Sequence, residues 1–215
     1  MDITKQLENI RGIYKDAAFD LKDCNPDPFL QFDKWMEEAI NAKCDEPNAF
    51  TLSTIKNNEP HARVVLLKGV VNDEFIFYTN YESNKGEEIK SNPQVAMTFL
   101  WLPLHRQVRV KGLAEFVDDS VSDDYFNKRP RGSQLGAIAS PQSREVSSIK
   151  FLEDSYKKVE EEFKNTDKIP RPKNWGGYKV RASSIEFWQG RDNRMHDRIL
   201  YTFKNGQWQL SRLAP

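Results

Sequence analysis

The chain has 215 residues, 38% of them hydrophobic, which is enough for a single domain with a sizeable core. Its 32 basic and 32 acidic residues give a formal net charge of +0, so no global field attracts the protein to nucleic acid or to an anionic membrane. Any binding site for an anion must therefore be local.

Cysteine usage and hydropathy limit the class of protein further. Cys24 and Cys44 have neither CxxC spacing nor a histidine partner at zinc spacing, so we expect no disulfide framework and no metal site. The N-terminal segment lacks an apolar leader, and no later segment has the apolar length of a membrane helix. We therefore expect a soluble protein of a reducing compartment, with a cytoplasmic location.

The first third of the chain switches from a helical to a strand period. After Asn25-Pro26-Asp27-Pro28, apolar residues at helical spacing predict an amphipathic helix over about 29–43. Patterns with a period of two then predict strands over 49–55, 62–71 and 74–79. Short turns connect these strands, which favours an antiparallel meander.

The rest of the chain extends the sheet and adds helices. Ser83 can cap a short helix over 83–91. Residues from about 120 to 165 lose the period of two and predict a helical insertion. Further strands are expected over 94–100, 106–116, 178–188, 199–203 and 208–213, the last two joined by Asn205-Gly206. The predicted fold is mainly β with flanking helices (α+β), with about eight antiparallel strands that are long enough to curl into a barrel.

The densest chemistry lies in residues 186–198, which read EFWQGRDNRMHDR. Arginine offers a planar fork of donors for phosphate, Trp188 offers a stacking face, and Gly190 lets the backbone turn between them. This pattern is typical of a site for a flat, anionic ligand. A solvated loop after a strand explains it equally well.

Two other basic clusters are open to two interpretations. Arg63 and Lys68 are an odd number of residues apart, so on a flat strand they face opposite sides. They are either solvated strand ends or ligands of two different anionic groups. Further on, Tyr125 and Arg129 share a helix face and Ser133 begins the next helix, which suits a phosphate but also suits a plain helix connection.

These clusters belong to an ordered series of motifs that covers the chain from about residue 28 to the end. The motifs are Arg63 to Lys68, Tyr78-Thr79, Arg106-Gln107-Val108, Arg129-Pro130-Arg131 with Ser133-Gln134, Gln142-Ser143, Trp175-Gly176-Gly177, Phe187-Trp188-Gln189-Gly190, Arg194-Met195-His196-Asp197-Arg198 and Arg212-Leu213-Ala214-Pro215. In this order they resemble the pyridoxine (pyridoxamine) 5'-phosphate oxidase family. A weaker match covers Arg11 to Tyr14.

The resemblance implies an FMN-binding split β-barrel of antiparallel strands, with the helical insertion at about 120–165. Residues 28–215 would form one domain, and residues 1–27 a partly flexible lid. It implies a homodimer with FMN at the subunit interface, and neither nucleic acid nor a membrane as partner. The implied reaction oxidises pyridoxamine 5'-phosphate and pyridoxine 5'-phosphate to pyridoxal 5'-phosphate, with a hydride passing from substrate C4′ to flavin N5 and O2 reduced to H2O2.

The resemblance also implies the site residues, position by position. The FMN site would comprise Arg63, Val64, Val65, Leu66, Leu67, Lys68, Tyr78, Thr79, Lys85, Gln107, Gln142, Ser143, Trp188 and Arg198. The substrate site would comprise Lys68, Tyr125, Arg129 and Ser133 around the phosphate, Arg194, Met195 and His196 near the pyridine ring, and Arg11 and Tyr14 from the N-terminal segment. Arg194 and His196 are the catalytic candidates, and no metal is needed because the flavin accepts the hydride.

Some positions depart from the family's pattern. Asn84 stands beside Lys85 where an arginine is common, and Gly12 follows Arg11 where a second arginine is common. The segment Arg191-Asp192-Asn193 adds a positive charge that has no assigned role. His196 lies between arginines, so we expect a largely neutral imidazole near pH 7. Whether it takes up a proton, forms a hydrogen bond to the substrate or only orients Asp197 stays open.

Three other classes of protein are weaker interpretations. A split-barrel carrier or sensor would bind FMN or pyridoxal phosphate without turnover, and another flavin oxidoreductase would use a nicotinamide or a deazaflavin. A carrier would not need the substrate-site residues that the resemblance implies. Those residues also argue against an oxidoreductase that uses a nicotinamide or a deazaflavin. A nucleic-acid module lacks both the required charge and an RNP or helix-turn-helix signature.

Overall fold

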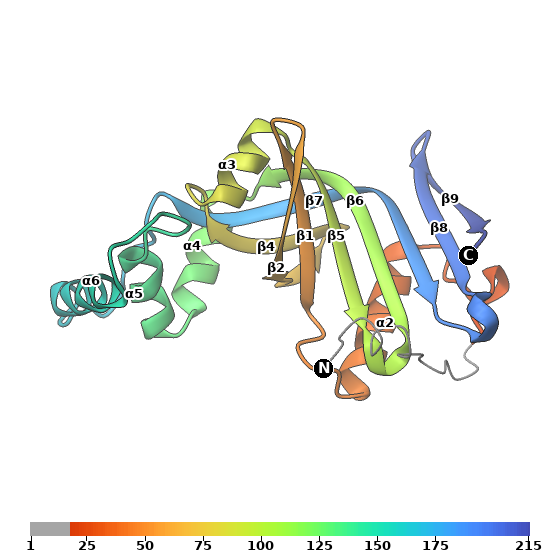
Figure 1. Cartoon of the computed structure of the whole chain (residues 1–215), viewed down its shortest axis with the longest axis horizontal. Coiled ribbons are helices and arrows are strands. Elements are labelled where there is room, and N and C mark those ends of the chain that lie inside the picture. The colour runs from red at the N-terminus through yellow and green to blue at the C-terminus, as the bar shows by residue number, and fades with distance from the viewer. Residues whose placement is uncertain (1–17) are drawn as a thin grey trace, which may run out of the picture. The chain divides into compact units, whose positions relative to one another are not determined.

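The structure is a computed structural model that describes residues 18–215. The chain divides into two compact units (Figure 1). Unit 1 contains Met1–Pro47, of which the described part begins at residue 18, together with Phe99–Arg109 and Ser184–Pro215. Unit 2 contains Asn48–Thr98 and Val110–Ser183. Strands β5 (Gln94–Trp101), β6 (Arg106–Phe116) and β7 (Trp175–Gln189) contribute residues to both units.

Unit 1 is built on helix α2 (Pro28–Asn41), which follows the short 3-10 helix η1 (Leu21–Asp23). The Asp27 side chain caps α2 by accepting hydrogen bonds from Phe29 N and Leu30 N, which satisfies donors that the first turn leaves open. The buried face packs Phe32 on Phe99 and Trp35 on Phe187, with ring centroids 5.1 Å apart in both pairs. The predicted helix is confirmed, and it ends two residues earlier than expected.

The rest of unit 1 is an antiparallel ladder. The end of β7 pairs with β8 (Asp197–Lys204), and β8 pairs with β9 (Gln207–Leu213). The predicted Asn205-Gly206 turn is confirmed, with φ of 52° and 79°, because Gly206 adopts the left-handed conformation without a side-chain clash. Two short 3-10 helices complete the unit, η2 (Leu102–Leu104) and η3 (Asp192–Arg194).

Unit 2 contains parts of seven strands in the order β2-β1-β5-β6-β7-β4-β3. The first four in the chain are β1 (Ala49–Lys56), β2 (Glu59–Leu66), β3 (Gly69–Val71) and β4 (Glu74–Asn80). The β1–β2 hairpin and the β3–β4 hairpin are both antiparallel. The antiparallel sheet with flanking helices confirms the predicted fold class.

The predicted meander is wrong at one point, because the expected strand over 62–71 divides into β2 and β3. Leu67 N donates to Asn48 O at 2.8 Å, next to β1, whereas Lys68 N donates to Ile76 O of β4 at 2.8 Å. The backbone therefore exchanges partners between two consecutive residues. As a result, β2 and β3 lie at opposite ends of the strand order.

The helices of unit 2 carry much of the candidate site. Helix α3 (Asn84–Ser91) begins at Ser83, whose side chain accepts from Gly86 N, as predicted. Helices α4 (Asp119–Lys128), α5 (Arg131–Ala139) and α6 (Ile149–Glu162) form the expected insertion. Phe126, Leu135, Ile169 and Trp175 are the buried centre of their hydrophobic core. Within residues 18–215, no helix has the length and apolar character that a membrane span requires.

Candidate functional site

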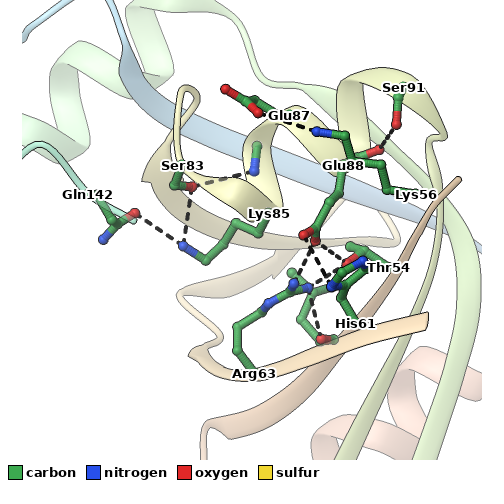
Figure 2. Close-up of polar contacts among 12 residues, drawn as sticks. Thr54, Lys56, His61, Arg63, Ser83, Lys85, Glu87, Glu88, Ser91 and Gln142 are labelled. Carbon is green, nitrogen blue, oxygen red and sulfur yellow. Dashed lines mark hydrogen bonds and ion pairs between the residues drawn. The ribbon is translucent and has the colours of Figure 1, made fainter. Parts of the chain in front are cut away.

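The first group of candidate FMN residues surrounds the start of α3 in unit 2 (Figure 2). Lys85 lies in the first turn, and its Nζ atom is 3.3 Å from Ser83 Oγ and donates to Gln142 Oε1 at 3.1 Å. The same Gln142 oxygen accepts from Thr79 Oγ1, at the end of β4, at 3.2 Å. Three candidate residues from separate segments therefore meet here. Ser143 follows Gln142 as an exposed residue with a φ of 68°.

Arg63 extends from β2 to α3, where it pairs with Glu88 (Figure 2). Its Nη2 atom lies 2.5 Å from Glu88 Oε2, and its Nη1 atom donates to Thr54 Oγ1 at 2.5 Å. The Thr54 hydroxyl in turn donates to Glu88 Oε2 at 2.5 Å. Burial by itself raises the pKa of Glu88, but the bond from Thr54 and the charge of Arg63 outweigh it and lower that pKa. Glu88 is therefore a buried carboxylate that orients Arg63.

These groups fit a phosphate. Burial, followed by the charge of Arg63, lowers the pKa of Lys85, so an anion would stabilise this ammonium group. The hydroxyls of Thr79 and Ser83 lie beside it as further hydrogen-bonding groups. Asn84, where a second cation was expected from the family's pattern, is exposed. A phosphate bound here would therefore meet two cations, Lys85 and Arg63.

The remaining candidates of the β2 segment differ in exposure. Val64 is exposed, Val65 and Leu66 are half-buried, and Leu67 is buried. Lys68 is exposed and lies beyond the end of β2, so the odd spacing between Arg63 and Lys68 does not place them on two faces of one strand.

Lys68 instead lies at a cavity of about 280 Å3 in unit 2, together with Tyr78 and Tyr125. The Tyr78 and Tyr125 rings are stacked, with centroids 3.8 Å apart and an angle of 11° between their planes. Trp175 continues the stack, 5.6 Å from Tyr78. Two candidate residues, Tyr78 and Tyr125, and the indole of Trp175 thus form one aromatic wall, and Lys68 lies at the same cavity as the two tyrosines.

Gly177 permits this wall. A Cβ atom at this position would lie 2.8 Å from Tyr78 Cε1 and 2.7 Å from a Val117 methyl carbon, closer than real Cβ atoms come. The Trp175-Gly176-Gly177 motif therefore combines a stacking ring with space for Tyr78. Trp175 was recognised in the sequence as part of this motif, but it was not predicted to be a site residue.

Arg129 directly follows α4 and covers the same indole. Its Cζ atom lies 4.5 Å from the centre of the Trp175 ring, a cation–π contact. Its Nη1 atom is buried and has no hydrogen-bond partner among the described residues. Burial also lowers the pKa of Arg129. Ser133 lies in the first turn of α5 with its side chain exposed.

The second group of candidates lies in unit 1. Arg198 on β8 donates from Nε to Glu186 Oε1 at 2.8 Å and from Nη1 to Ala214 O at 2.9 Å. Trp188 on β7 is half-buried, and its ring lies 4.6 Å from that of His196. Gln107 on β6 is also half-buried. Glu186, which orients Arg198, has no signal in the sequence because it alternates with apolar residues in a strand.

Arg194, Met195 and His196 belong to the loop between β7 and β8. Arg194 and Met195 are exposed, and His196 is half-buried. Met195 and His196 line a cavity of about 790 Å3, whose lining includes Arg212 and Pro215. Burial, followed by the charge of Arg194, lowers the pKa of His196. The expected direction of this shift is confirmed, with burial as the larger cause.

Two candidates, Arg11 and Tyr14, lie outside the described residues. The others form three groups: one around α3 and one around α4 in unit 2, and one on β6, β7, β8 and the β7–β8 loop in unit 1. Within residues 18–215, no cluster of three or more His, Cys, Asp or Glu side chains could hold a metal ion. The donors present are cations, hydroxyls and amides, which suit phosphate groups.

Comparison with known proteins gives matches along nearly the whole chain. The sequence profile of a family described as "Pyridoxamine 5'-phosphate oxidase" matches residues 36–163. A second profile, "Pyridoxine 5'-phosphate oxidase C-terminal dimerisation region", matches residues 175–215. Relatives named "Pyridoxine/pyridoxamine 5'-phosphate oxidase" are 48% identical in Salinibacter ruber, over 98% of this chain and 99% of theirs, and 47% identical in Burkholderia mallei, over 97% and 99%.

Solved structures show the same fold. PhzG from Burkholderia lata, in complex with tetrahydrophenazine-1-carboxylic acid, superposes with a TM-score of 0.88 at 23% identity, over 95% of this chain and 100% of that one. A pyridoxamine 5'-phosphate oxidase-related, FMN binding protein from Nostoc punctiforme gives a TM-score of 0.68 at 17% identity, over 85% and 96%.

The antiparallel sheet, its flanking helices and these structural likenesses define a split barrel of the FMN-binding type. The matched family profiles, and relatives that are 47–48% identical over nearly the full length, then show which family the chain belongs to. The chain belongs to the pyridoxamine 5'-phosphate oxidase family and is an oxidoreductase.

Proposed function

We propose that the protein binds FMN and oxidises pyridoxamine 5'-phosphate and pyridoxine 5'-phosphate to pyridoxal 5'-phosphate. The observation that carries the proposal is the buried Nη1 atom of Arg129, which lacks a hydrogen-bond partner among the described residues. A buried donor costs free energy unless a partner satisfies it. The phosphate of the substrate is the partner that this reaction supplies.

The relatives support this choice of substrate. Proteins that share 47–48% identity over nearly the full length carry the oxidase name. PhzG shares 23% identity, which supports the fold but not the transfer of its ligand to this chain.

Bound FMN would supply the two-electron acceptor, taking a hydride from substrate C4′ at N5 and passing the electrons to O2, which becomes H2O2. The alcohol substrate then gives the aldehyde directly, and the amine substrate also consumes water and releases ammonia. Lys85, Arg63 and Thr79 would hold the flavin phosphate. Gln107, Trp188 and Arg198 would also contact the cofactor, with Glu186 orienting Arg198.

The chain's own residues would bind and orient the substrate. Lys68 would act as a point charge on its phosphate and Arg129 as a planar fork, with Tyr125 and Ser133 as hydroxyl partners. Arg194 and His196 would contact the pyridine ring. Holding C4′ against the flavin accounts for catalysis without a nucleophile, since positioning alone supplies a large part of the rate.

We further propose a cytoplasmic homodimer in which each FMN lies between two subunits. The match of residues 175–215 to a C-terminal dimerisation region supports the dimer. Residues 28–215 would act as one domain, and residues 1–27 as a lid that brings Arg11 and Tyr14 to the substrate.

The test is a turnover assay with purified protein. We expect flavin absorbance, and we expect each substrate to yield pyridoxal 5'-phosphate and peroxide in equal amounts. A carrier or sensor would bind FMN but give neither product. Absence of flavin after incubation with FMN would refute the cofactor assignment, and turnover only with a nicotinamide or a deazaflavin would refute the substrate assignment.

A further inference from the structure

The loop that leads from β7 to β8 folds His196 back onto Arg191. The backbone N–H of Arg191 donates to Nδ1 of His196 at 3.0 Å. Asn193 and Arg194 have φ of 54° and 59°, which reverse the chain between these two residues. Met195 N closes the turn by donating to Asp192 O at 3.1 Å.

The first anchor of this loop lies at the end of β7. Gly190 N donates to His105 O at 2.7 Å. The buried Gln189 side chain donates from Nε2 to Leu104 O at 3.1 Å, and its Oε1 atom accepts from Arg106 Nε at 2.8 Å. The backbone that leads into Arg191 is therefore fixed by hydrogen bonds.

The second anchor is Asp197, the residue after His196. Its side chain is 8% exposed and accepts from Arg191 Nη1 at 3.2 Å through Oδ2. Oδ2 also accepts from Phe19 N at 3.1 Å, and Oδ1 accepts from Arg212 Nη1 at 2.6 Å. Arg191 thus holds the loop twice, by its amide at His196 and by its guanidinium at Asp197.

This geometry selects one form of the imidazole. A neutral imidazole has one donor and one acceptor nitrogen, and Nδ1 is the acceptor here. The proton must therefore be on Nε2. Among the described residues, the charge of Arg194 opposes a second proton on the ring, and the carboxylate of Asp197, next in the chain, is already paired with two arginines.

We propose that Arg191 is a positioning residue that fixes His196 as the Nε2–H tautomer, so that His196 donates a hydrogen bond to the substrate and does not accept its proton. This proposal rests on the proposed function. It gives a role to the extra positive charge of the 191–193 segment, which departs from the family's pattern. It also decides among the roles that the sequence left open for His196.

The direct test is nitrogen-15 NMR of the FMN-loaded protein, which reads the tautomer without turnover. The chain has three histidines, so a His196→Gln variant identifies the signal of His196. We expect Nε2 to carry the proton and Nδ1 to show the shift of an acceptor nitrogen. A proton on Nδ1, or exchange between both tautomers, would overturn the proposal. A locked tautomer in a protein that does not turn over either substrate would leave this result intact and would refute the proposed function instead.

Substitutions at His196 separate a donor from a proton acceptor. Glutamine offers an amide donor near the position of Nε2 but cannot take up a proton, whereas leucine offers neither. We expect His196→Gln to keep kcat/KM within about threefold and His196→Leu to lose about tenfold, the effect of one hydrogen bond. If both variants lose kcat/KM alike, by about 10²-fold or more, His196 is a general base and the proposal is wrong.

Substitution of Arg191 tests positioning. Arg191→Gln removes the ion pair to Asp197 but keeps the backbone N–H that bonds Nδ1. Because the loop is then held only from its β7 side at this residue, we expect the bond to Nδ1 to loosen, the tautomers of His196 to exchange and kcat/KM to fall, while Arg191→Lys restores both in part. The exposed Lys204 near the end of β8 gives the control, since Lys204→Gln should change neither. An unchanged His196 spectrum in Arg191→Gln would remove Arg191 from this role, even if the variant were less stable.

Discussion

An arginine with a buried, unsatisfied donor favours binding of an anion, because that donor loses its water when the protein folds. Arg129 is in this condition: one face of its guanidinium lies on Trp175, and Nη1 has no partner among the described residues. The indole keeps the cation in place without neutralising it, since a ring attracts positive charge but removes none. The charge therefore stays available to a phosphate.

Arg129→Ala should raise KM for both phosphate substrates about 10- to 100-fold, as expected for the loss of a charge-assisted hydrogen bond, and should change kcat much less. Steady-state kinetics measure both constants. The matched control is Arg131→Ala, because Arg131 is exposed and donates to Phe163 O and Thr166 O. Equal KM values for the Arg129 variant and the wild type would exclude Arg129 from the phosphate site.

Glu88 presents the opposite case, a buried anion that a cation satisfies. Glu88→Gln should lower the free energy of unfolding by about 2 kcal/mol, since it leaves Arg63 without its charge partner. We place the cost below that of a fully buried pair because the Arg63 side chain is 22% exposed. Denaturant unfolding of the variant and the wild type measures this change in the free energy of unfolding. Glu87→Gln, one residue earlier in α3 with a side chain that is 37% exposed, should give a much smaller change, because its pairs with Lys56 and Arg144 are accessible to solvent.

The sequence indicated the cations of the site but not their partners. Arg63, Lys85 and Arg129 could be named because the family's motifs contain them. Glu88 could not, because α3 is mostly polar and a glutamate in such a helix is normally solvated. Only the approach of β2 to α3 turns it into a buried carboxylate. The neighbours of a charge depend on tertiary structure, which local patterns do not encode.

Helix α4 carries Tyr125 and leads directly into Arg129, two of the phosphate candidates, and Arg171 holds this helix. The guanidinium bonds Asp119 and Asp123 on α4, both at 2.6 Å, and Trp175 O at 2.7 Å. Its side chain is 9% exposed. The segment before β7 is thereby tied to the helix that bears Tyr125, so the aromatic stack and the helix move together.

Arg171→Gln should therefore raise KM about tenfold although Arg171 touches no proposed ligand, because a helix displaced by about 1 Å misplaces the groups that it carries. Initial-rate kinetics and the melting temperature should be measured together. Arg181→Gln is the control, since Arg181 forms an exposed pair with Glu115. If KM stays at the wild-type value while stability falls, Arg171 has only a structural role.

At the scale of elements, helix caps and strand periods predicted the bounds of most helices and strands to within three residues, because each bound depends on neighbouring residues. The division of 62–71 into β2 and β3 could not be predicted in this way. A period of two reports which face is buried, but not which strand accepts each backbone N–H. The exchange of partners at Leu67 and Lys68 is a property of the whole sheet.

For the whole molecule, two buried carboxylates predict a loss of stability in acid. Burial raises the pKa of Asp197 and of Glu88, but their hydrogen bonds and cationic partners outweigh it, so both pKa values lie below the ordinary 3.8 and 4.5. Their contribution is fully present above those ordinary values and is lost as the pH falls through the lower, folded-state values. Denaturant unfolding between pH 6 and pH 3 should show the decrease, with a smaller slope for Asp197→Asn.

The proposed sharing of each flavin between two subunits predicts a result that differs from the result expected for a flavin held within one chain. Arg63→Ala and Arg198→Ala should each impair FMN binding when both subunits of the dimer carry the same change. If each site takes these two residues from different subunits, a mixed dimer contains one site with both changes and one with neither. Random re-assembly of equal amounts should then restore about one quarter of wild-type activity and flavin content, since half of the dimers are mixed and half of their sites are intact. Light scattering should report twice the chain mass throughout. Dimers that re-assemble without recovery would show that each flavin is bound within one chain.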